Sequence, residues 1–137
     1  MAKTICKVLG VVFLIIGFLG FISPNFLGMH LSATHNIIHL LSAALALYFG
    51  FAASPSAART FSMVFGAVYL LLGVLGFISP APVAALIRAH EVPGELHSLI
   101  PDNIVHLLLG AIFMIAGFSR ATHPTPITTG RGTTVRG

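Results

Sequence analysis

The sequence predicts an all-α integral membrane protein in which four transmembrane helices form two tandem helical hairpins. The first observation is composition: hydrophobic residues make up 56% of the 137 residues and charged residues only 7%. A soluble domain carries roughly a quarter charged residues, so most of this surface is expected to face lipid. The second observation is an internal repeat. Eleven of seventeen positions are identical between residues 8–24 and 64–80, and eight of seventeen between residues 35–51 and 102–118, which indicates two copies of one unit.

Four apolar runs of 15 to 18 residues are the expected membrane spans: residues 5–22, 36–53, 61–78 and 104–118. Each is near the lower limit for crossing a bilayer core about 30 Å thick. The first run resembles a secretory signal, but its twin lies in the middle of the chain and only Ser-Pro follows each copy. We therefore expect the first run to be a retained transmembrane helix.

Charge distribution predicts the orientation. Six of the seven Lys and Arg residues fall on the side that holds both termini and the middle loop, and all three acids fall on the other, outer side. The positive-inside rule then places both termini in the cytoplasm. The sequence pI near 10 follows from this distribution and from the shortage of acids, so it is no argument for nucleic-acid binding.

The expected domain organisation follows from the repeat. Residues 1–118 form a four-helix transmembrane domain, with repeat one over 5–53 and repeat two over 61–118, and residues 119–137 form a disordered basic cytoplasmic tail. Two spans per repeat give both copies the same orientation, so the repeats are parallel. The second outer loop is the longer one, and its helical spacing predicts a short interfacial helix that starts at Pro82.

Glycines recur at matching places in the first and third predicted helices. Small residues let membrane helices approach closely, so a helix-packing role is expected, with a solute path or a hinge as the alternative. The glycines are Gly10, Gly17 and Gly20 in the first copy and Gly66, Gly73 and Gly76 in the second.

Polar residues open both returning helices, in the shared pattern Asn-Ile-(Ile/Val)-His-Leu-Leu. Three residues are close to one helical turn, so each Asn is expected to share a face with its His and to point between the second and fourth helices. Polar groups inside a membrane segment usually face the bundle interior. The candidate site residues are His35, Asn36 and His39 in the first copy and Asp102, Asn103 and His106 in the second.

Three interpretations of these residues stay open. The leading one is an interhelical hydrogen-bond clasp in a non-enzymatic structural or accessory subunit that carries no cofactor. The second is a haem or transition-metal site at the outer face, of undetermined metal, with His90, Glu91, Glu95 and His97 of the second outer loop completing the shell. The third is a small solute or proton transport component that acts as an oligomer. No HExxH, CxxC, GxSxG or phosphate-loop pattern is present, so an enzyme is not expected.

The doubled pattern VLG…GFISP followed by Asn-Ile-(Ile/Val)-His-Leu-Leu resembles the small bacterial membrane proteins grouped as domain of unknown function 4383, over residues 5–118. The resemblance implies four helices, a bacterial origin and an inner-membrane location, and it implies no activity. His35, Asn36 and His39 match the family's HN-x-x-H motif, whereas Asp102 replaces the first His in the second copy. That replacement argues against four equivalent histidine ligands. The expected partners are the lipid bilayer and either further copies of the chain or a larger membrane complex.

Overall fold

The computed structural model describes residues 1–26, 28–87, 95–119, 127–129 and 133–135. Within these residues the chain forms five helices and two small antiparallel strand pairs. The helices are α1 (Ala2–Ile22), α2 (Ala33–Phe51), α3 (Pro55–Ile78), α4 (Pro80–Ile87) and α5 (Glu95–Phe118). The strands are β1 (Asn25–Phe26), β2 (Met29–His30), β3 (Ile127–Thr129) and β4 (Thr133–Val135).

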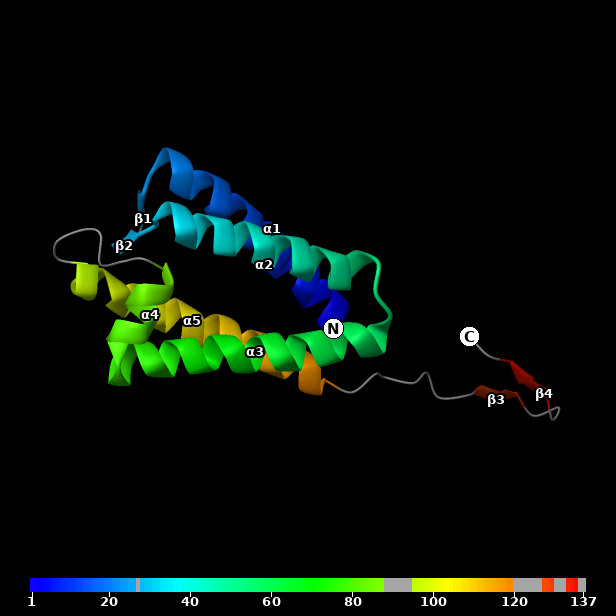
Figure 1. The fold of residues 1–137 in the computed structure, drawn as a ribbon. Helices are drawn as coiled ribbons and strands as arrows, with labels where there is room; N and C mark the ends of the chain where they lie inside the picture. The colour runs from blue at the N-terminus through cyan, green and yellow to red at the C-terminus, as the bar shows by residue number, and fades with distance from the viewer. Residues whose placement is uncertain (27, 88–94, 120–126, 130–132, 136–137) are drawn as a thin grey trace.

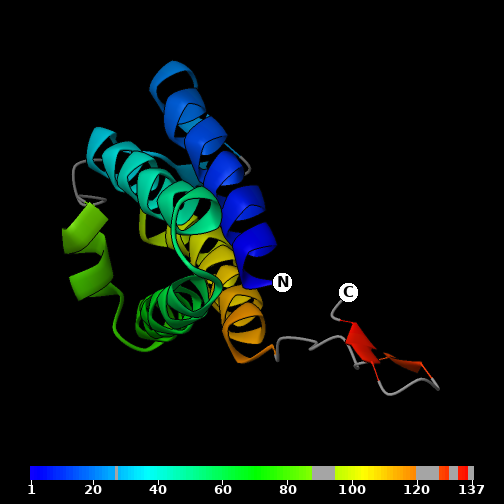
Figure 2. The same ribbon diagram turned by 90° about the vertical axis from the view of Figure 1, so that its right-hand side faces the viewer.

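Four of the described helices are long and apolar enough to cross a membrane: α1, α2, α3 and the part of α5 from Ile100 to Phe118. They form a bundle in which α1 packs beside α2 and α3 packs beside α5 (Figure 1, Figure 2). Many large apolar side chains stay exposed on the outside of this bundle, such as Ile22, Leu41, Leu71 and Leu108. The prediction of an all-α protein with four apolar spans is therefore confirmed.

The helix ends follow from local sequence. Ser54 begins α3 because its side chain accepts a hydrogen bond from the Ala57 N–H at 3.2 Å, with Pro55 at the first helical position. An apolar run does not include such a polar first turn. The helix α3 therefore begins six residues before the span predicted for it, and α5 also begins before its predicted span. The residues before Pro24 and Pro80 are extended, as proline requires, and these prolines stop α1 and α3.

Helices α1 and α3 approach their partners through glycines. A methyl group on Gly20 would overlap the Asn36 side chain of α2, and one on Gly76 would overlap Asn103 of α5. The other four glycines from the sequence pattern also lie on these seams. Gly10 and Gly17 face Leu47 and Leu40 of α2, and Gly66 and Gly73 face Met114 and Leu107 of α5. The helices in each pair can lie this close because glycine has no side chain.

Aromatic side chains fill the space between the two helix pairs. Phe13 of α1 and Phe113 of α5 are fully buried, with ring centroids 6.4 Å apart. Phe61 and Phe65 of α3 pack against this cluster. Cys6 is buried beside it, with Sγ 3.4 Å from Ser62 Oγ. This packing joins the α1–α2 pair to the α3–α5 pair.

Basic side chains close the end of the bundle that carries the N-terminus. Lys3 Nζ donates to two carbonyl oxygens near the end of α2. One belongs to Phe51, the last residue of the helix, at 3.3 Å, and the other to Ala53, just beyond it, at 2.9 Å. Arg59 Nε donates to the Gly117 carbonyl at 3.1 Å, near the end of α5. Cations at helix C-termini donate hydrogen bonds to free carbonyl oxygens and interact favourably with the negative end of the helix dipole.

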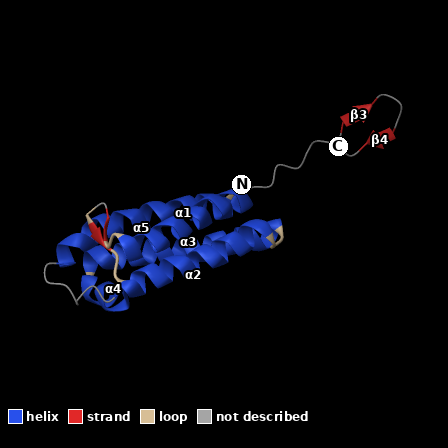
Figure 3. Ribbon diagram, turned by 90° about the horizontal axis from the view of Figure 1, so that it is seen from above, coloured by secondary structure: helices blue, strands red, loops and turns tan. Residues whose placement is uncertain are grey.

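A β-hairpin and a short helix lie at the opposite end (Figure 3). The hairpin pairs Asn25 with His30 and Phe26 with Met29, and Gly28 supplies the left-handed conformation of its turn with φ of 79°. The sequence predicts a short outer loop over residues 25–34 and no strands there. Helix α4 begins at Pro80 rather than Pro82, and its interfacial position stays a prediction. Arg88, His90 and Glu91 lie outside the described residues, as do the side chains of Glu95 and His97.

The prediction of a disordered tail over residues 119–137 also stays a prediction. Within that segment the structure describes strands β3 and β4, which pair with Ile127 opposite Val135. Their composition is rich in threonine, and threonine favours strands.

Candidate functional site

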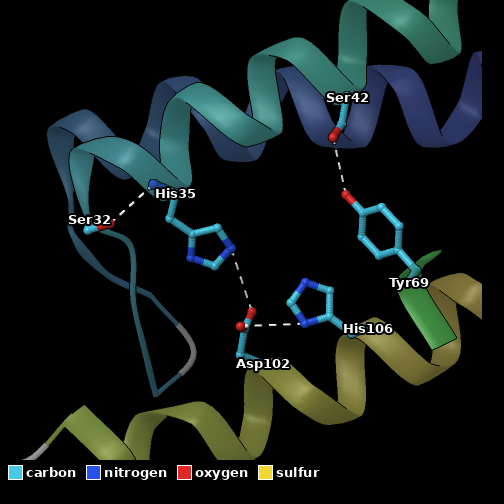
Figure 4. Close-up of polar contacts among 6 residues, drawn as sticks. All are labelled: Ser32, His35, Ser42, Tyr69, Asp102 and His106. Carbon is cyan, nitrogen blue, oxygen red and sulfur yellow. Dashed lines mark hydrogen bonds and ion pairs between the residues drawn. The ribbon is translucent and has the colours of Figure 1, made fainter. Parts of the chain in front are cut away.

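Three titratable side chains from α2 and α5 converge between the two helix pairs, and we call them the His–Asp–His cluster: His35, Asp102 and His106 (Figure 4). The Asp102 carboxylate lies 3.8 Å from His35 Nε2 and 3.5 Å from His106 Nδ1. The three residues are 2%, 5% and 6% exposed. One carboxylate therefore lies between two imidazoles from different helices in a buried position.

Local structure positions each member of the cluster. His35 lies in the first turn of α2, where Ser32 caps the helix by accepting a hydrogen bond from the His35 backbone N–H at 3.1 Å. Asp102 and His106 are four residues apart on α5 and so share a face. The β1–β2 hairpin lies against the same part of α5, since Pro101 is the nearest side chain to Gly28.

His39 and Tyr69 extend the site one turn further into the bundle. The His39 ring lies 4.4 Å from the His35 ring and 5.9 Å from Phe13, measured between centroids. The Tyr69 ring lies 5.3 Å from His106, and its hydroxyl lies 3.2 Å from Ser42 Oγ. Sequence reasoning did not single out Phe13, Tyr69 or Ser42. The repeat carries a signal for the first two, because Phe13 and Tyr69 occupy equivalent places in the two copies.

Several buried polar atoms of the site have no hydrogen-bond partner among the described residues. They include Nδ1 of His35, His39 and His106, and Oδ2 of Asp102. The 3.5 Å separation between His106 and Asp102 is an ion-pair distance and is long for a hydrogen bond. Leaving such groups unpaired in an apolar surrounding costs free energy, and an unpaired buried group calls for an explanation such as a bound ion.

The two asparagines are not part of this cluster. Asn36 Nδ2 donates to the Leu31 carbonyl at 3.3 Å, and its side chain lies against Gly20. Asn103 lies against Gly76 in the same way. A spacing of three residues turns the side chain by about 60° from alignment, because an α-helix has 3.6 residues per turn. Each Asn therefore lies on the seam within its helix pair, while each His faces the space between the pairs.

A cavity of about 280 Å³ adjoins the cluster. It is lined by His35, His39 and His106 together with residues of α2, α3 and α4. The site thus combines a buried set of nitrogen and oxygen ligands with an adjacent, mostly apolar space.

The donor set is suited to a divalent transition metal. One ligand atom from each member of the His–Asp–His cluster lies within 4.8 Å of the others. Atoms bound at about 2.0–2.2 Å to a tetrahedral zinc ion lie about 3.4 Å apart. The separations of 3.8 Å from His35 Nε2 to Asp102 Oδ1 and of 3.5 Å from His106 Nδ1 to Asp102 Oδ2 are close to that value. A haem between the two imidazoles fits poorly, because the Asp102 carboxylate contacts both rings.

Comparison with known proteins identifies a family. The model of the domain of unknown function (DUF4383) matches residues 3–119. No curated protein and no solved structure matches the chain. The matched segment contains all the described helices except the first residue of α1, and the resemblance seen in the repeated motif is confirmed: the chain belongs to the DUF4383 family.

Proposed function

We propose that this protein binds one divalent transition-metal ion of the zinc type between α2 and α5, as a non-catalytic membrane component. The observation that carries the proposal is the convergence of His35, Asp102 and His106 from two helices in a buried position. Two imidazoles and one carboxylate form a ligand set that zinc and other first-row metals favour. A bound ion would also pair His106 Nδ1 and Asp102 Oδ2, which have no hydrogen-bond partner among the described residues.

The proposed setting is the bacterial cytoplasmic membrane, with both termini in the cytoplasm. The charge asymmetry supports this orientation. The His–Asp–His cluster lies near the first turn of α2, toward the end of the bundle opposite the N-terminus. The ion would therefore enter from the periplasmic side. We also propose that the two helix pairs are parallel repeats, which the equivalent contacts Gly20–Asn36 and Gly76–Asn103 support.

A second candidate function is the structural one. The contacts of Asn36 with Gly20 and of Asn103 with Gly76 favour a clasp within each helix pair. In that case the protein serves as an accessory subunit, as a homo-oligomer or in a larger membrane complex, and the cluster needs no ion.

Metal analysis of the purified protein separates the two functions. Full-length protein is purified in mild detergent, loaded with zinc, passed through a desalting column, and examined by elemental analysis and an optical spectrum of the same sample. We expect stoichiometric zinc and no haem absorption in the wild type. Asp102→Asn and His106→Gln should lower zinc affinity by about tenfold or more, since even residues that only support a ligand change affinity by about 10–100-fold.

His30→Gln is the matched control. His30 is another histidine at the same end of the chain's bundle, and its Nδ1 lies 2.9 Å from Asn25 Oδ1 in the β-hairpin. This variant should keep full zinc. Wild-type protein that retains no zinc would favour the structural clasp, and equal loss in His30→Gln and Asp102→Asn would show that the ion is bound elsewhere.

A further inference from the structure

The cavity beside the His–Asp–His cluster has its mouth on the outer surface of the bundle. Val68 of α3 and Leu86 of α4 line the cavity and are also 47% and 52% exposed. Val83 of α4 lines it too and is buried. The cavity therefore opens between α3 and α4, and α4 forms part of its wall.

This mouth lies at the depth of the membrane core. Val68 precedes the end of α3 by ten residues, which corresponds to about 15 Å along the helix axis, or half of a bilayer core about 30 Å thick. The exposed residues along the same helix are apolar, such as Val64 and Leu71. A molecule that enters here comes from the lipid phase, so it must be soluble in lipid.

The lining of the cavity is mostly apolar and includes three polar side chains that we call its polar wall: His39, Ser42 and Tyr69. His39 and Ser42 lie three residues apart on α2, and Tyr69 faces them with its hydroxyl 3.2 Å from Ser42 Oγ. Val68 and Leu72 of α3 lie on the apolar side. His39 does not belong to the His–Asp–His cluster, and it lines the cavity.

The chemistry of the walls selects a neutral molecule with a flat ring. Asp102 is the one acidic side chain that the structure describes; its carboxylate lies beside His35 and His106, which line the cavity, and disfavours an anionic ligand. Rings surround the polar wall, with centroids 5.0 Å apart for Phe65 and Tyr69 and 5.3 Å for Tyr69 and His106. Aromatic side chains favour stacked or edge contacts with another ring. An imidazole N–H and a hydroxyl donate to carbonyl acceptors.

We propose that the cavity binds a lipid-soluble quinone, whose ring carbonyl accepts a hydrogen bond from His39 while its apolar body lies along Val68 and Leu72. The volume of about 280 Å³ is adequate for a substituted ring, because a cavity of about 150 Å³ in another protein holds benzene. The proposal concerns binding alone. The proposed hydrogen bond comes from His39, which is not one of the proposed metal ligands, whereas His35 and His106 belong both to the cavity lining and to the proposed metal site.

The test is a titration of the full-length protein in lipid nanodiscs with decylubiquinone, followed by calorimetry. We expect saturable binding to the wild type. Val68→Trp places a large side chain at the mouth and should weaken binding by about tenfold or more, which corresponds to about 1.4 kcal/mol. Val64→Trp is the matched control, since Val64 is 61% exposed on the same helix and does not line the cavity. It should bind as the wild type does.

Two further variants test the hydrogen bond. His39→Leu should weaken quinone binding, and His39→Gln should retain more of it because Gln keeps an N–H donor. Decanoate, which has a similar chain and an anionic head, should not compete with decylubiquinone. Effective competition by decanoate, equal weakening by Val68→Trp and Val64→Trp, or no binding to wild-type protein would overturn the proposal.

The same titration distinguishes this proposal from the metal site. Asp102→Asn should lose zinc but still bind decylubiquinone in protein stripped of metal. Val68→Trp should retain zinc but lose the quinone. If the protein binds no quinone, its zinc binding can still be measured, and if it binds no zinc, its quinone binding can still be measured.

Discussion

Replacing Gly20 by alanine should destabilise the protein strongly, because the space beside Gly20 is occupied by Asn36. The new Cβ would overlap Asn36 Oδ1 and lie 2.8 Å from Nδ2. Asn36 is 1% exposed and cannot move aside without breaking its 3.3 Å hydrogen bond to the Leu31 carbonyl. Overpacking costs about 1–3 kcal/mol, and the lost hydrogen bond adds about 0.5–1.5 kcal/mol. The free energy of unfolding should therefore fall by about 1.5–4.5 kcal/mol.

The chain provides its own probe for this measurement. Cys6 is the single cysteine of the sequence and is 0% exposed. A maleimide dye that fluoresces on reaction with a thiol therefore reports unfolding in detergent without an added label. Gly17→Ala is the graded comparison: its Cβ would meet the flexible end of the Leu40 side chain at 2.8 Å, so a smaller loss is expected.

A double-mutant cycle tests the cause. In Gly20→Ala/Asn36→Ala the overlapping side chain is absent, so the double variant should be more stable than the sum of the single changes predicts, by about 1–3 kcal/mol. Additive losses would refute the reasoning, because they would mean that the two residues do not restrict each other.

Three other predictions concern the rest of the bundle. Lys3→Ala and Arg59→Ala should each lower stability in the thiol assay by about 0.3–1 kcal/mol, because each removes a cation from a helix C-terminus; no change in either would contradict the capping role. Tyr69→Phe leaves the Ser42 hydroxyl without its partner and should cost about 0.6–1.7 kcal/mol in the same assay, whereas an unchanged melting temperature would argue against that bond. Of two reporters fused at Gly137, one that works only in the cytoplasm should be active and one that works only in the periplasm should be inactive. Activity of the periplasmic reporter would reverse the proposed orientation.

Most of the fold follows from the apolar runs of the sequence. In each run the backbone N–H and C=O groups lie in lipid without water, so they must form hydrogen bonds with each other. A helix forms all of these bonds within one segment. The runs do not include polar first turns, so the hydrophobic pattern alone places the start of α3 too late: the helix begins at Pro55, where Ser54 caps it. The β1–β2 hairpin depends on the positive φ of Gly28 and on packing against α5, neither of which an apolar run records.

The candidate site is harder to predict, because its contacts join residues from different copies of the repeat. His35 and Asp102 occupy equivalent positions in the two copies, and from sequence alone this difference argues against four equivalent ligands. In three dimensions the difference makes the two residues complementary, since the carboxylate lies 3.8 Å from the imidazole. Ser42 and Tyr69 also come from different copies, although their positions are not equivalent, and their hydroxyl oxygens lie 3.2 Å apart. Sequence periodicity shows that two positions are equivalent, but it does not show that they meet.

X-ray absorption at the zinc edge tests the proposed metal site most directly. The full-length protein, loaded with zinc and desalted in mild detergent, should give a first shell of nitrogen and oxygen at about 2.0–2.2 Å, with the multiple scattering of two imidazoles. Asp102→Asn should remove this bound zinc. A shell that contains sulfur at about 2.3 Å, a shell of oxygens without imidazole, or no retained zinc would contradict the assignment of His35, Asp102 and His106 as a metal site.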